Sequence, residues 1–276
     1  METSLDLERI KERKALRGYA NLFRKENQAW WGTRRWWINA LLWSGMLGGL
    51  VLVMLYILPP LAAATGDPNV AEAGGQAAFG LLMARQVFFE LGTLAVSIGV
   101  IVLFQDMIVN ERQSGLTEWL LAKPIARRSY VLSKLSASLL VVLIILITLP
   151  ALFTYLLLSL GAGSFFPPGA FLGGLGVMVV NSVFYLTLTL MLGTFFTSRP
   201  PLLGIALGAV LGGNLLASFI KPLLYVTPWM LPKVASLVAG GQPVSDGMLW
   251  PPLITSVVWS VLFILIALMK FKRTEF

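Results

Sequence analysis

The chain of 276 residues is 57% apolar and only 12% charged, and its mean hydropathy is +0.80. Soluble domains carry about 25% charged residues, so this composition argues against a soluble globular protein. Because cysteine and histidine are both absent, disulfides, thiolate chemistry, imidazole catalysis and the commonest transition-metal ligands are excluded. The net charge of +8 is typical of nucleic-acid binding, but in a membrane chain it is better explained by Lys and Arg gathered on the cytoplasmic face.

The N-terminal segment, residues 1–35, is polar and basic and holds nine of the 21 Lys and Arg residues. Its apolar residues recur near helical spacing, at Leu16, Tyr19, Phe23 and Trp30. This pattern predicts an amphipathic helix lying in the membrane interface, although a solvated helix packed on a partner has a similar pattern. The Trp30-Trp31 and Trp36-Trp37 pairs favour the interface, because tryptophan collects at the headgroup level.

Six stretches are apolar enough to cross a bilayer, which takes about 20 residues. They cover residues 36–60, 85–107, 135–160, 170–196, 201–220 and 250–269. Pro59-Pro60 is expected to end the first span, and residues 61–84 read as an external loop. A proline-rich segment with a short helix near 229–238 precedes the last span. The sequence thus predicts an all-α integral membrane domain over residues 36–276.

The distribution of Lys and Arg predicts the orientation of these spans. Eighteen of these residues fall on one face and three on the other when six spans are drawn. The basic face carries both termini and the 108–134 loop, so we expect these parts in the cytoplasm.

Glycines recur every four residues on the first and fifth spans. They are Gly45 and Gly49 on the first, and Gly204, Gly208 and Gly212 on the fifth. Small residues at this spacing let helix backbones approach closely in lipid. The partner helix could belong to a second subunit or to the same bundle.

Glu90 is the one acidic residue well inside a predicted span, and Arg85 lies five residues before it. A carboxyl group at such a depth is a candidate for substrate contact, while a structural ion pair with Arg85 explains it equally simply. Ser218 and Lys221 have a spacing that could serve a nucleophile and its base. No supporting motif accompanies them, and a helix end with a snorkelling lysine accounts for the same residues.

The most informative segment is the charged loop between the second and third spans. A short helix is predicted over residues 111–123, ending before Pro124, with an apolar stripe of Leu116, Trp119 and Leu120. Such a helix is suited to insert into a groove on a partner, and it could also rest on lipid headgroups.

This loop resembles the corresponding loop of type-2 exporter permeases of the ATP-binding-cassette (ABC) transporters. The family pattern is roughly Glu-Arg-Glu-x-Gly-Thr, a Leu-Leu pair, Pro-x-x-Arg, and Gly-Lys at the start of the next span. The matching residues are Glu111, Arg112, Gly115, Leu120, Leu121, Pro124, Arg127 and Lys134. Gln113, Leu116 and Ser133 depart from the pattern. The layout is most similar to the branch with the nitrous-oxide-reductase maturation and gliding-associated permeases.

The resemblance implies an N-terminal elbow helix and a coupling helix that docks on a separate ABC ATPase. The coupling residues would be Glu111, Arg112, Gly115, Trp119, Leu120, Pro124 and Arg127. The resemblance also implies a prokaryotic plasma membrane and a dimer of permease subunits that meet near the first and fifth spans.

The sequence lacks a Gly-x-x-x-x-Gly-Lys-Ser/Thr loop to cradle phosphates. We therefore expect ATP and Mg²⁺ on the partner ATPase and no cofactor or metal on this chain. Other functions stay open: a maturation permease that passes mechanical work to other proteins, an ATP-independent channel or carrier, and a membrane-embedded enzyme. The apolar spans argue against a channel, which needs a polar stripe on several spans.

Overall fold

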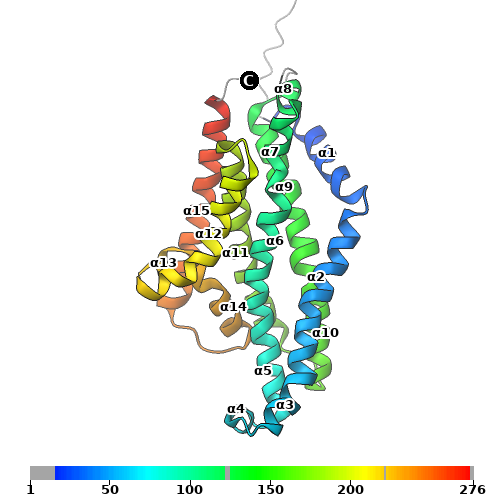
Figure 1. Ribbon diagram of the computed structural model, residues 1–276, viewed down its shortest axis with the longest axis vertical. Helices are drawn as coiled ribbons and strands as arrows, with labels where there is room; N and C mark the ends of the chain where they lie inside the picture. The colour runs from blue at the N-terminus through cyan, green and yellow to red at the C-terminus, as the bar shows by residue number, and fades with distance from the viewer. Residues whose placement is uncertain (1–15, 122–124, 221, 274–276) are drawn as a thin grey trace, which may run out of the picture.

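A computed structural model describes residues 16–121, 125–220 and 222–273, and throughout these ranges the regular structure is helical, with no strand (Figure 1). Five helices there are long and apolar enough to cross a membrane. They cover Arg35–Ala64, Gln76–Gln113, Arg127–Ala162, Pro168–Phe195 and Asp246–Phe271. The predicted span at 201–220 corresponds to α12 (Arg199–Phe219). Its described apolar part, Arg199–Gly213, is shorter than the other five.

The first long helix follows the N-terminal helix α1 (Tyr19–Trp31). It consists of α2 (Arg35–Leu52), the π-helical η1 (Val53–Ile57) and α3 (Leu58–Ala64). The prediction that Pro59-Pro60 ends this span is wrong. The prolines occupy the first positions of α3, where a missing N–H is tolerated, and the wider turn of η1 precedes them.

The second long helix, of 38 residues, starts well before the predicted span. After the short α4 (Pro68–Glu72) it runs through α5 (Gln76–Phe89), α6 (Leu91–Phe104) and α7 (Asp106–Gln113), with breaks at Glu90 and Gln105. The external loop expected at 61–84 is therefore mostly helical. It contains two helix starts, at Asp67, whose carboxylate caps α4, and at Gly75, whose φ is +114°.

The helix expected over 111–123 is divided. Gly115 has a φ of +70°, a left-handed conformation that interrupts a helix and favours glycine. Glu111 therefore belongs to the last turn of α7, and a separate helix α8 covers Leu116–Leu121. Pro124 lies outside the described residues.

The third long helix consists of α9 (Arg127–Val141), the π-helical η2 (Val142–Thr148) and α10 (Leu149–Ala162). It is followed by α11 (Pro168–Phe195) and α12. The segment before the last helix folds as α13 (Leu223–Val226), the 3₁₀ turn η3 (Pro228–Met230) and α14 (Leu231–Ala239), in agreement with the short helix predicted there. The last helix is α15 (Asp246–Arg273).

Helices α11 and α15 both end beside α7 and α9. The guanidinium of Arg112 donates to the carbonyl of Thr194 at the end of α11 (3.1 Å), and the ring of Phe271 in α15 stacks on Tyr130 of α9, with centroids 4.9 Å apart. The chain between α11 and α15 must therefore lead away from this end and back. Figure 1 shows α12 running away from it, with α13 and α14 beyond its far end.

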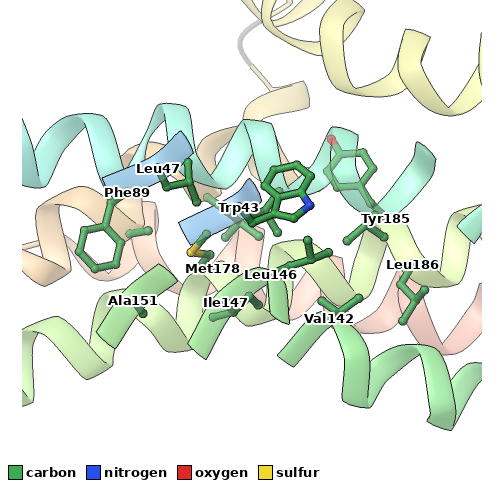
Figure 2. Close-up of a cluster of buried hydrophobic side chains, with 14 of the residues drawn as sticks. Trp43, Leu47, Phe89, Val142, Leu146, Ile147, Ala151, Met178, Tyr185 and Leu186 are labelled. Atoms are coloured by element: carbon green, nitrogen blue, oxygen red, sulfur yellow. The ribbon is translucent and has the colours of Figure 1, made fainter. Parts of the chain in front are cut away.

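Figure 2 shows the part of the core where side chains of α2, α5, η2, α10 and α11 meet. The same buried cluster also includes side chains of α12, α14 and α15. Glycines allow the closest approaches: a Cβ on Gly48 would lie 2.2 Å from the Phe153 ring, and one on Gly99 would lie 2.3 Å from Trp43. Helix α11 is the most central, because 67% of its apolar window is buried, against 22% for the first and last spans. Dispersion and close packing hold such helices together in lipid.

Candidate functional site

The richest polar cluster of the described chain surrounds Glu111 at the end of α7. One carboxylate oxygen lies 2.6 Å from the Nζ of Lys25 in α1. The other lies 2.9 Å from the Nζ of Lys134 in α9 and accepts a hydrogen bond of 2.7 Å from the Tyr130 hydroxyl. One side chain therefore joins α7 to α9 and to α1, which is far away in the sequence.

Lys134 is the most buried charge in this cluster, with a side chain only 2% exposed. Besides Glu111 it contacts Glu26 of α1, with 3.0 Å between Nζ and Oε1, and Lys25 lies 3.6 Å from the same oxygen. Two lysines and two glutamates thus balance in charge. We call Lys25, Glu26, Glu111 and Lys134 the charge cluster. Buried charges are tolerated only when they are paired in this way.

Tyr130 links the charge cluster to α8 and α15. Its hydroxyl lies 3.2 Å from the Thr117 hydroxyl of α8, and its ring stacks on Phe271 with an interplanar angle of 8°. Leu120 of α8 packs with Leu22 and Tyr130 in a small apolar cluster. As a result, one face of α8 is joined to α9 and belongs to an apolar cluster that also includes Leu22 of α1 and Phe271 of α15.

The opposite face of α8 is largely exposed. The side chain of Trp119 is 58% exposed, while Leu120 is 8% exposed. The apolar stripe predicted from the sequence is therefore divided between the two faces: Leu120 points into the protein and Trp119 is presented on the surface. The turn before α8 is also open, since a Cβ on Gly115 would meet no atom within 4 Å.

Two further predicted residues anchor the ends of neighbouring helices. Arg112 donates to the Thr194 carbonyl, and the next side chain, Gln113, donates to the Thr197 carbonyl (2.8 Å). Arg127 donates to the Phe271 carbonyl at 3.4 Å. These contacts secure the α11–α12 turn and the end of α15 against α7 and α9.

The segments that flank α1 and α8 also meet. The Ala126 N–H donates to the Arg17 carbonyl (3.1 Å), and the Tyr19 hydroxyl forms a hydrogen bond of 2.7 Å with Ser136 of α9. Helix α1 therefore packs along α9 of its own chain. The pattern of α1 predicts an interfacial helix or a helix packed on a partner, and the structure supplies an intramolecular surface for its inner face.

Arg85 and Glu90 lie elsewhere, near the α5–α6 break. No ion pair joins the two side chains within 4 Å in the described structure, although the two charges interact at longer range. The Arg85 guanidinium lies against Gly240 at the end of α14, where a Cβ would be 2.1 Å from its Nη1. A cation at a helix C-terminus is favourable, so Arg85 helps to seat α14.

The predicted packing glycines face away from the described bundle. A Cβ added at Gly45, Gly49, Gly204, Gly208 or Gly212 would find nothing within 4 Å. Other glycines make the close contacts inside the chain, among them Gly48, Gly99 and Gly174. The recurrence alone does not distinguish these two groups.

An apolar hollow of about 360 Å³ lies between α10 and α11, remote from the charge cluster. Thr148, Tyr155 and Phe171 contribute to its lining, and the Tyr155 hydroxyl already donates to the Phe166 carbonyl (2.9 Å). Within the described residues no group of three acidic side chains could hold a metal ion. Lys221 and the side chain of Ser218 lie outside the described residues.

Sequence reasoning missed Lys25, Glu26 and Tyr130. Lys25 and Glu111 are separated by 86 residues, and Glu26 and Lys134 by 108. The one signal that the sequence offered was the presence of a lysine and a glutamate, Lys25 and Glu26, inside the predicted amphipathic helix.

Comparison with known proteins identifies the family of the chain. Residues 20–276 match the family model of the ABC-2 family transporter protein. No curated protein sequence matches the chain significantly. The match covers nearly the whole chain, including α1, the charge cluster and all the long helices, and the chain therefore belongs to the ABC-2 transporter family of membrane proteins.

Proposed function

We propose that this chain is the permease subunit of an ATP-driven exporter and that α8 is its coupling helix. One observation carries the proposal: a charge-balanced cluster around the buried Lys134 joins α1, α7 and α9 directly behind a short helix whose outer face is exposed. A surface helix that is fixed to several spans can transmit a displacement, whereas a loosely attached helix would absorb it.

In this proposal Trp119 inserts into a groove on a separate ABC ATPase, which binds ATP and Mg²⁺. Large aromatic side chains are typical anchors of protein interfaces. When the ATPase subunits close, α8 is displaced, and Tyr130 and Glu111 pass the displacement to α9, α7 and α1. Transport follows because ATP binding changes the relative stability of inward-open and outward-open states.

A second permease subunit completes the transporter. The open glycine faces of α2 and α12 support this part of the proposal, because they remain available for close helix packing between subunits. The partner subunit is a second copy or a related permease. The substrate path lies between the first, second and fifth spans.

We infer six crossings, with α12 as the fifth. Helices α11 and α15 end on the same side of the molecule, so the chain between them has to cross and return. Helix α12 is long enough for this crossing, because its 21 residues span about 31 Å at 1.5 Å per residue, close to the roughly 30 Å thickness of the hydrocarbon core. The excess of Lys and Arg at the α7–α9 end supports a cytoplasmic location of that end. A prokaryotic plasma membrane is part of the same proposal, because the resemblance of the 108–134 loop implies it.

The direct test is purification of the tagged protein together with a co-expressed ABC ATPase in mild detergent. We expect a stoichiometric complex with the wild type and its loss with Trp119→Ala. Trp250→Ala is the matched control, because Trp250 is similarly exposed (53%) but belongs to the first turns of α15 at the far end of that helix. Equal recovery of the ATPase with both variants would refute docking through α8.

A further inference from the structure

The start of α12 carries a charge that its own helix does not favour. Arg199 is the one charged residue between Lys134 and Lys221 in the sequence, and it occupies the first position of α12. A cation at a helix N-terminus opposes the helix dipole. The first turn of α12 contains no acidic residue, and Ser198 makes no side-chain capping bond.

The compensating charge comes from another span. The carboxylate of Asp106, in the first turn of α7, lies 2.6 Å from the Nε of Arg199. Asp106 directly follows Gln105, where the second long helix is interrupted. The ion pair therefore connects the cytoplasmic end of the second span, at a break, with the start of α12.

The remaining contacts of α12 make this pair influential. One face of the helix, with Leu202, Ala206 and Val210, is buried against the bundle, and the glycine face is open. Farther along, the indole N–H of Trp229 donates to the Ala209 carbonyl (2.8 Å). Polar contacts therefore hold α12 at two points, one at Arg199 and one at Ala209. The Arg199 end is the one that lies beside α7.

We propose that Asp106 and Arg199 are positioning residues that hold α12 against α6 and thereby set the balance between a closed and an open cytoplasmic mouth of the substrate path. This inference rests on the proposed function. Both side chains are partly exposed, 49% for Arg199 and 40% for Asp106. Exposed pairs contribute little energy, which suits a contact that must form and break in every cycle.

Electron spin resonance can measure the distance between α6 and α12 in the full-length protein in lipid nanodiscs. Val102 of α6 and Ile205 of α12 are both exposed, so a cysteine at each position accepts a spin label. The chain has no cysteine of its own, and an excess of unlabelled wild-type chain suppresses distances between subunits. No ATPase is present, so the result does not depend on ATPase binding.

We expect Asp106→Asn and Arg199→Gln to increase the population with a longer α6–α12 distance about two- to fivefold. The double charge reversal, Asp106→Arg with Arg199→Asp, should return the population toward the wild type. Salt near 1 M should increase the population with the longer distance in the wild type, as the neutral variants do, because it screens the ion pair. The same salt should have no further effect on Arg199→Gln. Lys233→Gln, which removes an exposed cation on α14, is the control and should leave the distances unchanged.

Three outcomes would overturn the inference. The first is an unchanged distance distribution in both neutral variants. The second is a double reversal that is displaced as far as the single variants. Arg199→Lys keeps the charge and guards against a folding defect: a displacement equal to that of Arg199→Gln would show that the ion pair is not what holds α12.

Discussion

Replacing Glu111 by Gln removes a charge from the centre of the charge cluster and changes the shape of the side chain very little. Three donors lose a carboxylate acceptor: the ammonium groups of Lys25 and Lys134 and the hydroxyl of Tyr130. The amide oxygen can still accept from one of them. Lys134 keeps Glu26 at 3.0 Å, so its charge is not left alone.

The size of the expected stability loss follows from the contacts that remain in Glu111→Gln. A hydrogen bond to a charged group contributes roughly 1.5–3 kcal/mol, and leaving a buried charge without a partner costs about 3–5 kcal/mol. Because Glu26 still pairs with Lys134, the lower range applies to Glu111→Gln. We expect a loss of about 2 kcal/mol in the free energy of unfolding.

The assay is reversible unfolding in mixed micelles, with a double-mutant cycle that adds Lys134→Met. The double variant removes both members of the pair, so it should be less destabilised than the sum of the single variants by at least about 1 kcal/mol. Glu72→Gln, on the exposed α4, is the control and should change stability by less than about 0.5 kcal/mol. Additive effects of Glu111→Gln and Lys134→Met would refute the ion pair between these two residues.

Three other changes have defined outcomes. Gly115→Ala forces a side chain onto a φ of +70°, and we expect about 1–2 kcal/mol of destabilisation and weaker ATPase binding in the co-purification. Gly99→Ala places a methyl group against the Trp43 ring and should lower the unfolding temperature, whereas Gly49→Ala, with open space around it, should not. Asn181→Leu removes the α11–α6 hydrogen bond to Ser97 (2.7 Å), and we expect a loss of about 0.6 kcal/mol by micelle unfolding. Equal thermal shifts for both glycine variants, or full stability of Asn181→Leu, would contradict these contacts.

The apolar spans could be predicted from the sequence, because the bilayer requires long apolar segments whatever the tertiary contacts are. The residues at which the helices begin and end could not be predicted in the same way. Pro59-Pro60 and the segment 76–84 show the reason. At the proline pair, the π-helical turn of η1 allows the helix to continue through the prolines. In the segment 76–84, Gly80 allows α5 to pass close to the Leu55 carbonyl, because a Cβ added at Gly80 would lie 2.9 Å from that oxygen. Close approaches of this kind depend on a neighbouring helix, and the periodicity of the sequence carries no information about which helix is the neighbour.

Only part of the site could be predicted from the sequence. Glu111, Gly115 and Trp119 stand within one short segment that has a recognisable spacing. Their partners Lys25 and Glu26 come from a helix that the sequence describes only as amphipathic. The pairing depends on how α1 folds back along α9, so it became visible only in three dimensions.

Crosslinking from a cysteine at position 114 tests the central claim most directly. Ser114 is exposed in the turn directly before α8, so Trp119 stays in place. The chain has no cysteine of its own, and a photoreactive maleimide placed by Ser114→Cys therefore reports contacts at the start of α8 alone. The account predicts a crosslink to the ABC ATPase in the co-expressed complex. A probe placed by Leu160→Cys, at a residue 72% exposed near the end of α10, should give none. An ATPase crosslink from position 160 and not from position 114, or none from either in an intact complex, would contradict α8 as the coupling helix.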